Sequence, residues 1–369
     1  MAVSRIDEAG LNINQFGNRN LIINGAMQVA QRGTARTVSD GGAEGYQTLD
    51  RFSFNYGNSA GGIATISQDT TVPSGQGFSN SYKVDIAQAD TSVGADHMIY
   101  IETKLEAQDI RNSGWDYTNS SSNITLSFWA RSVKAGIYNV VFRAQDVGAK
   151  YYPVEYTLVA DTWKKVTVTV PGDSSLVFNN DNGSGLQVRW NLQLGTNRDN
   201  GTANQWNATD ASNAGTSNQV NFFDHLDNNF YLTGIQLEVG DTATDFEHRT
   251  FADELQRCQR YFCRTYPHGT STGTATSNGA VCSSSQASTV YMSAGTFRFP
   301  VEMRSTPTCV VYSTANANTT GKVASDSTDG TGSASFISAT STFVHRNNDG
   351  TGVSANTFLK AHVTADAEL

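Results

Sequence analysis

The sequence predicts a mainly β protein: an antiparallel jelly-roll β-sandwich, a short linking α-helix and a smaller C-terminal β-sandwich domain. Between Asp50 and Val239, short stretches of alternating apolar and polar residues recur between clusters of turn-forming residues. A helical period is clear only near Leu255, and strand-like alternation resumes after Pro267. Many short strands with one polar face favour an antiparallel sandwich over a parallel sheet with crossover helices.

The chain has 369 residues, too many for one ordinary hydrophobic core. The order of strands, helix and strands therefore predicts two domains of unequal size. We divide the chain into a terminal segment 1–19, a jelly-roll domain 20–248, a linking helix 249–266 and a C-terminal β domain 267–369.

Composition excludes several classes of partner. The formal net charge is −9 and the sequence has no run of Lys or Arg, so a nucleic-acid backbone is not an expected ligand. The sequence contains no stretch of about 18 apolar residues that would indicate a membrane span. The first ten residues lack the pattern of a signal peptide. We therefore expect neither membrane insertion nor secretion, and assembly in the cytoplasm of the producing cell.

The strands before the helix follow from period-2 alternation. Residues 1–18 are polar with isolated apolar side chains, typical of either a frayed terminus or a peptide that docks on a partner. An apolar strand is predicted over 20–30, with a turn or bulge at Asn24 and Gly25. Further strands are predicted over 51–56, 63–68, 81–86, 97–104, 124–131, 138–145, 156–158, 165–170, 186–194 and 230–239, with one helical turn over 105–110.

Alternation also sorts the side chains into an inward and an outward set. In 186–194 the apolar Leu186, Val188, Trp190, Leu192 and Leu194 form the inward set. If the strands share one sheet, the outward sets form a polar platform that includes Thr167. The candidate glycan-binding residues on it are Trp129, Arg143, Arg189, Asn191 and Gln236.

A partly exposed Trp among amide and guanidinium groups is the kind of surface that stacks on a sugar ring and hydrogen-bonds its hydroxyl groups. The alternative is that this platform packs on another subunit or on the helix. The insertion 196–220 carries Trp206, which either pins the loop to the sandwich or takes part in recognition. Asn179 to Gly183 is rich in oxygen ligands and is interpreted as a turn, with calcium binding left open.

The linking helix has a clear start signal. Thr250 is the predicted N-cap, with Asp253 three residues later. Its apolar stripe consists of Phe251, Leu255, Cys258 and Phe262. Such a stripe must be buried, and the obvious neighbours are the β units on either side of the helix. We also predict that the stripe contributes to an oligomer interface, most simply a homotrimer.

The C-terminal domain is predicted from weaker signals. Residues 269–289 are either a linker or polar strands, and 297–304 alternate strictly with Pro300 marking an edge strand. Polar loops over 314–333 and 347–355 are expected to form variable tips. The other strands are predicted over 309–312, 334–337, 342–345 and 357–363.

Three segments carry a resemblance to a known family: GIQLEVGDTATDFEHRTFADELQRCQRYF, NLIINGAMQVAQRG and the ending VTADAEL. They resemble bacteriophage tail-fibre-like structural proteins of the virion. The resemblance implies a jelly roll like those of carbohydrate-binding proteins followed by a smaller β domain. It also implies attachment through 1–19 to other tail or neck proteins, a host cell-surface glycan as partner, and the virion as location.

No catalytic motif, cofactor motif or metal-ligand spacing is present in the sequence. Together with the family resemblance and the polar β composition, this favours a structural and adhesive virion protein, and no enzyme activity is expected. The alternatives are a stand-alone carbohydrate-binding module protein, or a capsid or neck decoration protein without a receptor role. A capsule depolymerase would need a long repeat-bearing β-helix, for which the sequence has no signal.

Overall fold

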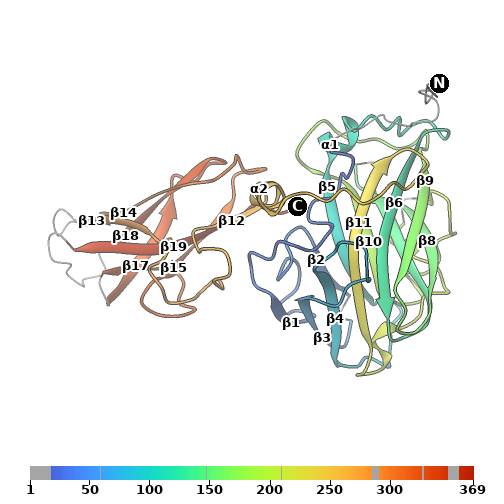
Figure 1. Cartoon of the computed structure of the whole chain (residues 1–369), viewed down its shortest axis with the longest axis horizontal. Coiled ribbons are helices and arrows are strands. Elements are labelled where there is room, and N and C mark those ends of the chain that lie inside the picture. Colours follow the sequence, from blue (N-terminus) through green and yellow to red (C-terminus); the bar gives the residue numbers. More distant parts are fainter. Residues whose placement is uncertain are drawn as a thin grey trace, which may run out of the picture.

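The computed structural model describes residues 18–58, 60–146, 148–208, 210–284, 291–325, 328–347 and 357–369. Two β parts lie on either side of the helix α2 (Phe251–Gln259) (Figure 1). Strands dominate and their pairings are antiparallel, so the predicted fold class is confirmed. Residues 1–17 of the predicted attachment segment and most of the predicted variable tip 347–355 lie outside the described residues.

The larger part is a sandwich of two sheets. The first sheet has the order β1 (Ala35–Ser39), β3 (Ile63–Asp69), β4 (Ser81–Gln88), β11 (Asn229–Val239), β6 (Asn123–Ser132) and β9 (Lys164–Pro171). The second has the order β2 (Ser53–Gly57), β5 (Met98–Glu106), β10 (Ser184–Leu194), β7 (Gly136–Ala144) and β8 (Lys150–Leu158). Short helices are α1 (Ala107–Arg111), η2 (Ala211–Asn213) and η3 (Phe222–Asp224).

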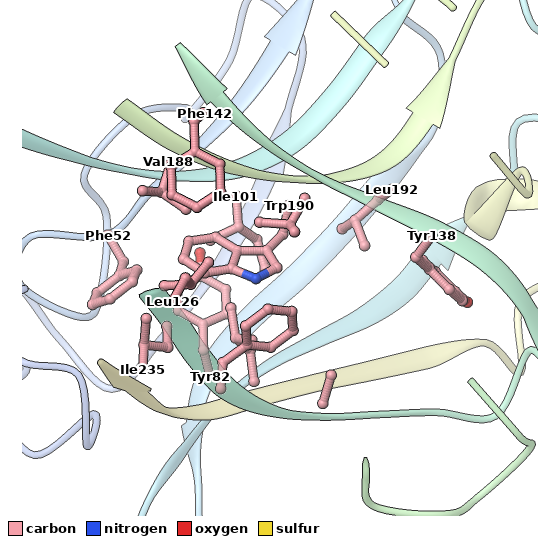
Figure 2. Packing of buried hydrophobic residues seen from close by; sticks show 14 of the residues in the cluster. Phe52, Tyr82, Ile101, Leu126, Tyr138, Phe142, Val188, Trp190, Leu192 and Ile235 are labelled. Atoms are coloured by element: carbon pink, nitrogen blue, oxygen red, sulfur yellow. The ribbon is translucent and has the colours of Figure 1, made fainter. Parts of the chain in front are cut away.

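Trp190 lies in the middle of the core between the two sheets, among the labelled side chains of Figure 2. Its ring centroid is 5.7 Å from that of Phe128 and 6.3 Å from that of Phe52. The inward set predicted for β10 is confirmed for Leu186, Val188, Trp190 and Leu192, because these side chains are fully buried. Leu194 is wrong: after a register shift between Asn191 and Gln193 it is only half-buried and packs on a separate cluster with Met98 and Val141. Each fully buried side chain contributes about 1.5–3 kcal/mol by leaving water, which makes this core the main source of stability.

The predicted strand over 20–30 is wrong, although its backbone does pair. Leu21 N donates to Leu237 O (2.9 Å) and Ile235 N donates to Gly25 O (3.0 Å). The segment thus pairs with the second half of β11, after the residues of β11 that pair with β4. Asn24 has a φ of 63°, which turns the chain there. A Cβ on Gly25 would lie 2.1 Å from Ile235 O, so this close approach requires glycine.

The smaller part is one sheet with the order β12 (Phe262–Arg264), β19 (Phe358–Asp366), β16 (Lys322–Ser325), β17 (Thr328–Ser335), β18 (Ser341–Asn347) and β14 (Tyr291–Arg298). β13 (Val281–Ser284) and β15 (Thr308–Ser313) also pair with β19, so β19 is the central strand of this part. Val311, Val323, Val344 and Val363 are buried in its core.

Two strand predictions in the smaller part need correction. The strand expected over 297–304 ends at Arg298, before Pro300, which has no N–H to donate to a strand ladder. The loop expected over 314–333 contains β16 and most of β17. β16 has only four residues, and β17 consists mostly of Gly, Ser and Thr, so neither shows the apolar alternation on which the prediction depended.

Helix α2 starts as predicted, because the Thr250 side chain accepts a hydrogen bond from Asp253 N (3.2 Å). The helix ends at Gln259 and not at 266 as predicted, and Phe262 lies in β12 rather than on the helical stripe. The predicted stripe residues are covered within the chain: Cys258 and Phe262 are buried, and Leu255 is half-buried. Phe251 is 37% exposed. Burial of the stripe therefore does not call for another subunit, which corrects the reason for the predicted interface and leaves the homotrimer a prediction.

Charged residues from distant parts of the sequence meet at the junction between the two β parts. Glu368 forms ion pairs with Arg32 (3.4 Å) and with Arg51, while Asp366 pairs with Arg32 at 2.8 Å. The Arg51 guanidinium also lies 3.5 Å from the ring centroid of Tyr261. Glu368 and Arg51 are nearly inaccessible to water, so the network is a buried one.

A further carboxylate, Glu106, also belongs to the junction. It accepts hydrogen bonds from Arg260 Nε (2.8 Å), Arg260 Nη2 (2.9 Å) and Tyr261 Oη (2.6 Å). Burial alone would raise the pKa of Glu106, but the bonds from Arg260 and Tyr261 hold it below its usual value. The three segments that carry the family resemblance thus all contribute to this junction, where their side chains join the two β parts.

Candidate ligand-binding face

The outward side of the five-stranded sheet is the candidate site. Because side chains alternate along β10, the residues between its buried apolar ones point away from the core. Neighbouring strands add outward side chains in register: Glu102 of β5 pairs with Arg189, and Gln187 lies between Lys104 and Arg143. We call the following residues the polar face: Tyr100, Glu102, Lys104, Arg143, Gln187 and Arg189.

Arg189 is at the centre of the polar face. Its Nε donates to Glu102 Oε1 (2.6 Å), and its Nη2 donates to Gln187 Oε1 (2.9 Å). Its guanidinium carbon lies 4.5 Å from the ring centroid of Tyr100. Burial alone would lower the pKa of Arg189, but Glu102 raises it above its usual value, so the guanidinium stays charged.

Two more cations extend this network. Arg143 Nη1 donates to Gln187 Oε1 (2.8 Å) and Arg143 Nε donates to Tyr151 Oη (3.1 Å). Lys104 Nζ lies 3.6 Å from Glu102 Oε2. Gln187 accepts from both arginines, so its side-chain orientation is determined by them.

The polar face combines buried and accessible side chains. Glu102, Gln187 and Arg189 are buried, whereas Tyr100, Lys104 and Arg143 are half-buried. Burial raises the pKa of Tyr100, so its hydroxyl is neutral. The buried residues thus hold an accessible ring and two accessible cations in place, which is the preorganisation that ligand binding requires.

The loop over 195–220 covers the other end of the same sheet face. Asn191 Nδ2 donates to Ala214 O (2.8 Å), and Thr216 N donates to Asn139 Oδ1 (3.1 Å). Asn191 is completely buried, so it cannot contact a ligand in this structure, which corrects its assignment to the glycan platform. Trp206 Nε1 donates to Pro171 O (2.8 Å), so this Trp pins the loop to the sandwich.

The five predicted glycan residues do not form one surface. Arg143, Arg189 and Asn191 lie in the five-stranded sheet, whereas Trp129 and Gln236 lie in the six-stranded sheet on the opposite side of the sandwich. Alternation placed each side chain on an outward face but did not say which strands share a sheet.

Trp129 is half-buried and lies outside the main core, so its outward orientation was predicted correctly. Gln236 is completely buried, and its Nε2 donates to Glu238 Oε1 (2.9 Å). Thr167, the other platform residue of this sheet, is exposed on β9. Tyr100, Glu102 and Lys104 were missed, although alternation with the buried Ile99 and Ile101 would have placed them outward.

The groove between the two β parts is a second hollow, with a volume of about 870 Å³. Arg32, Asp366 and Glu368 line it, and these charges pair with one another. Phe262 and Tyr312 add aromatic surface. Because the charges of Arg32, Asp366 and Glu368 are paired with one another and belong to the junction, we regard this groove as structural.

Neither a metal centre nor a membrane span is found in the described part of the chain. No three or more His, Cys, Asp or Glu side chains gather there as metal ligands would. In the Asn179 to Gly183 stretch, Asp181 Oδ1 accepts from Gly183 N (2.9 Å), as in a turn. No described helix is both long and apolar enough to cross a bilayer.

The polar face can bind a ligand by hydrogen bonds, charge and ring stacking. Its one carboxylate, Glu102, is engaged by Arg189 and Lys104. A glycosidase needs two carboxyl groups flanking the scissile bond, and the polar face supplies one. Recognition without catalysis is the chemistry that these six side chains support.

Comparisons with known proteins give structural neighbours of the sandwich. No protein-family model matches the chain, and no curated protein matches it. Solved structures that match include the C-terminal family 22 carbohydrate binding module of Xyn10B from Clostridium thermocellum. It is 10% identical, with 62% of this chain and 100% of that chain covered, and the TM-score is 0.32.

Two further neighbours are of the same kind. A CBM4 structure is 15% identical and covers 59% of this chain and 98% of its own, with a TM-score of 0.30. The family 11 carbohydrate-binding module from Clostridium thermocellum is 13% identical and covers 56% and 95%, with a TM-score of 0.27. TM-scores of this size say nothing about what this chain binds, so its ligand is argued from its own side chains.

Proposed function

We propose that this chain is a glycan-binding structural protein of a bacteriophage particle, a tail fibre or similar appendage, without enzyme activity. The observation that carries the glycan-binding part is the polar face, where Gln187, Glu102 and Arg189 hold the accessible Tyr100, Lys104 and Arg143 in place. Sugars present hydroxyl groups around an apolar ring face. Oriented amide and guanidinium groups bind the hydroxyl groups, and a tyrosine ring stacks on the ring face.

The virion part of the proposal rests on the family resemblance and on the first described residues. Asn18 N and Asn20 N donate to the Glu247 carboxylate at 3.0 and 2.8 Å, which anchors the chain beside the junction. The residues before this anchor belong to the proposed attachment segment 1–19. They would bind other tail or neck proteins, while the folded parts face the host.

A homotrimer would strengthen weak glycan binding. Several copies held together raise avidity by roughly 10²–10⁴ without any new contact, so a weak site on each subunit suffices to hold a cell. Oligomerisation through α2 would use its exposed Phe251 and half-buried Leu255.

The alternative function is a stand-alone carbohydrate-binding protein, because the polar face would serve it equally well. Localising the chain on purified phage particles by antibody labelling separates the two. Labelled particles support the virion proposal, and unlabelled particles favour the stand-alone protein. A decoration protein without a receptor role would label particles but bind no glycan.

Glycan binding is tested with an array of bacterial surface oligosaccharides, using the wild type and Tyr100→Ala. Tyr231→Ala is the matched control, since Tyr231 lies on the opposite sheet with its ring centroid 5.1 Å from the Arg131 guanidinium carbon. We expect Tyr100→Ala to lose array binding and Tyr231→Ala to retain it. Wild-type protein that binds nothing on the array contradicts the proposal, as does equal loss in both variants.

A further inference from the structure

We infer that the polar face is selective for acidic saccharides, with Arg143 binding the carboxylate of a uronic acid unit. This inference rests on the proposed glycan-binding function and names its ligand class. Lys104, Arg143 and Arg189 share the polar face with a single carboxylate, Glu102, which leaves a local excess of positive charge in a chain whose net charge is −9.

The carboxylate of Glu102 is already shared. Arg189 Nε lies 2.6 Å from Glu102 Oε1, and Lys104 Nζ lies 3.6 Å from Glu102 Oε2. Lys104 Nζ also donates to Leu369 O at 2.8 Å. Glu102 is thus engaged by two cations, and Arg143 is not one of them, although burial favours pairing each charge with an opposite one.

Arg143 is that third cation. Its hydrogen-bond partners, Gln187 and Tyr151, are both neutral, and within the described ranges no carboxylate lies within 4.0 Å of its guanidinium. A half-buried guanidinium with only neutral partners is the group that gains most from an anionic ligand.

The bonds that Arg143 already makes leave a usable edge. Nε is taken by Tyr151 and one Nη1 hydrogen by Gln187. The second Nη1 hydrogen and the Nη2 group are left, and together they match the two oxygens of a carboxylate. A lysine at this position would bind as a point charge without that geometry.

The register suggests an oligosaccharide rather than a single sugar. Tyr100 lies on β5 and Arg143 on β7, with β10 between them. They are two strands and four residues of register apart, because Tyr100 pairs with Asn191 and Arg143 pairs with Gln187. Standard sheet spacings place their Cα atoms roughly 16 Å apart, a distance that only several linked sugar units span.

The opposite face of the sandwich provides a contrast. There Arg131 pairs with Asp161 at 2.7 Å and Lys83 pairs with Asp85 at 3.1 Å. Each of these two cations has its own carboxylate, so the guanidinium of Arg131, unlike that of Arg143, is paired. Arg131→Gln is therefore the matched control for Arg143→Gln.

The test is isothermal titration of the full chain with oligogalacturonate and oligomannuronate, and with the neutral oligogalactose and oligomannose of the same length. We expect at least one acidic oligosaccharide to bind about 10- to 100-fold more tightly than its neutral counterpart, the range for a hydrogen bond to a charged group. Arg143→Gln should erase that preference, and Arg131→Gln should keep it. Arg143→Lys should keep part of the preference, because the positive charge remains but the paired N–H groups of the guanidinium are lost.

The outcomes separate this inference from the proposed function. If neutral and acidic oligosaccharides bind equally, glycan binding stands and the inference is wrong. An acidic preference that survives Arg143→Gln also overturns it. If none of the four probes binds, and the array is also negative, the proposed function fails and the inference fails with it. Melting temperatures of all variants show whether a lost preference reflects lost folding.

Discussion

Removing the Glu368 carboxylate should loosen the junction between the two β parts. The side chains of Glu368 and Arg51 are 5% and 2% exposed, so Glu368→Ala leaves Arg51 as a buried cation without its partner. Arg32, only 9% exposed, loses one of its carboxylates but keeps Asp366 and Asp50. Breaking a buried ion pair from one side costs about 3–5 kcal/mol.

The assay is urea denaturation followed by tryptophan fluorescence and by far-UV circular dichroism. We expect Glu368→Ala to lower the unfolding free energy by about 3–5 kcal/mol. The control is Asp85→Ala, which removes the 47% exposed partner of Lys83 and should cost less than about 1 kcal/mol. If Glu368→Ala costs no more than Asp85→Ala, the buried network does not hold the junction as described.

Further predictions concern pH, the two sheet faces, the attachment segment and assembly. Burial raises the pKa of Asp50 to about 6, so its stabilising contribution is present at low pH and is lost as the pH rises through about 6. Relative to Asp50→Asn, the wild type should therefore lose about 2–3 kcal/mol of stability between pH 4 and pH 7, and parallel stability curves for the two proteins would contradict this. Trp190→Ala should cost about 3–5 kcal/mol because the ring is fully buried, whereas Trp129→Ala should cost less than half of that and leave array binding unchanged. A chain that starts at Asn20 should fold normally and fail to join virions, and normal occupancy on particles would refute the attachment role of 1–19. Light scattering at micromolar concentration should give the mass of a trimer, and a monodisperse monomer would rule the trimer out.

Strand positions in the sandwich were predictable because period-2 alternation is strong there. In β9 burial alternates as the sequence indicates, with Val166, Val168 and Val170 buried. In β6 and β10 the predicted inward apolar residues Leu126, Phe128, Val188 and Trp190 are buried too, although neighbouring polar residues are also covered there. The N-cap Thr250 was also predictable, because capping depends on residues only three positions apart. These are local signals, and they survive in the fold unchanged.

The candidate site was only partly predictable, because sheet membership is not local. Trp129 and Arg189 are both outward, yet β6 and β10 belong to different sheets. Asn191 does not belong to an accessible surface, because a loop more than twenty residues further along the sequence covers it through Ala214. No alternation pattern carries that information.

The helix stripe shows the same difficulty. Cys258 and Phe262 are apolar and buried as expected, but the surface that covers them belongs to the same chain. Arg32 and Arg51 reach this region from far upstream in the sequence, and Glu368 reaches it from just beyond the last strand. The sequence indicated the flanking β units as neighbours of the stripe but did not identify these charged residues.

The most direct test of the account is a crystal structure of the chain with the tightest-binding oligosaccharide from the titration panel. We predict a sugar ring against Tyr100 and a carboxylate within hydrogen-bond distance of Arg143. An oligosaccharide bound elsewhere, such as in the groove beside Tyr312, with the polar face empty, would contradict the central claim.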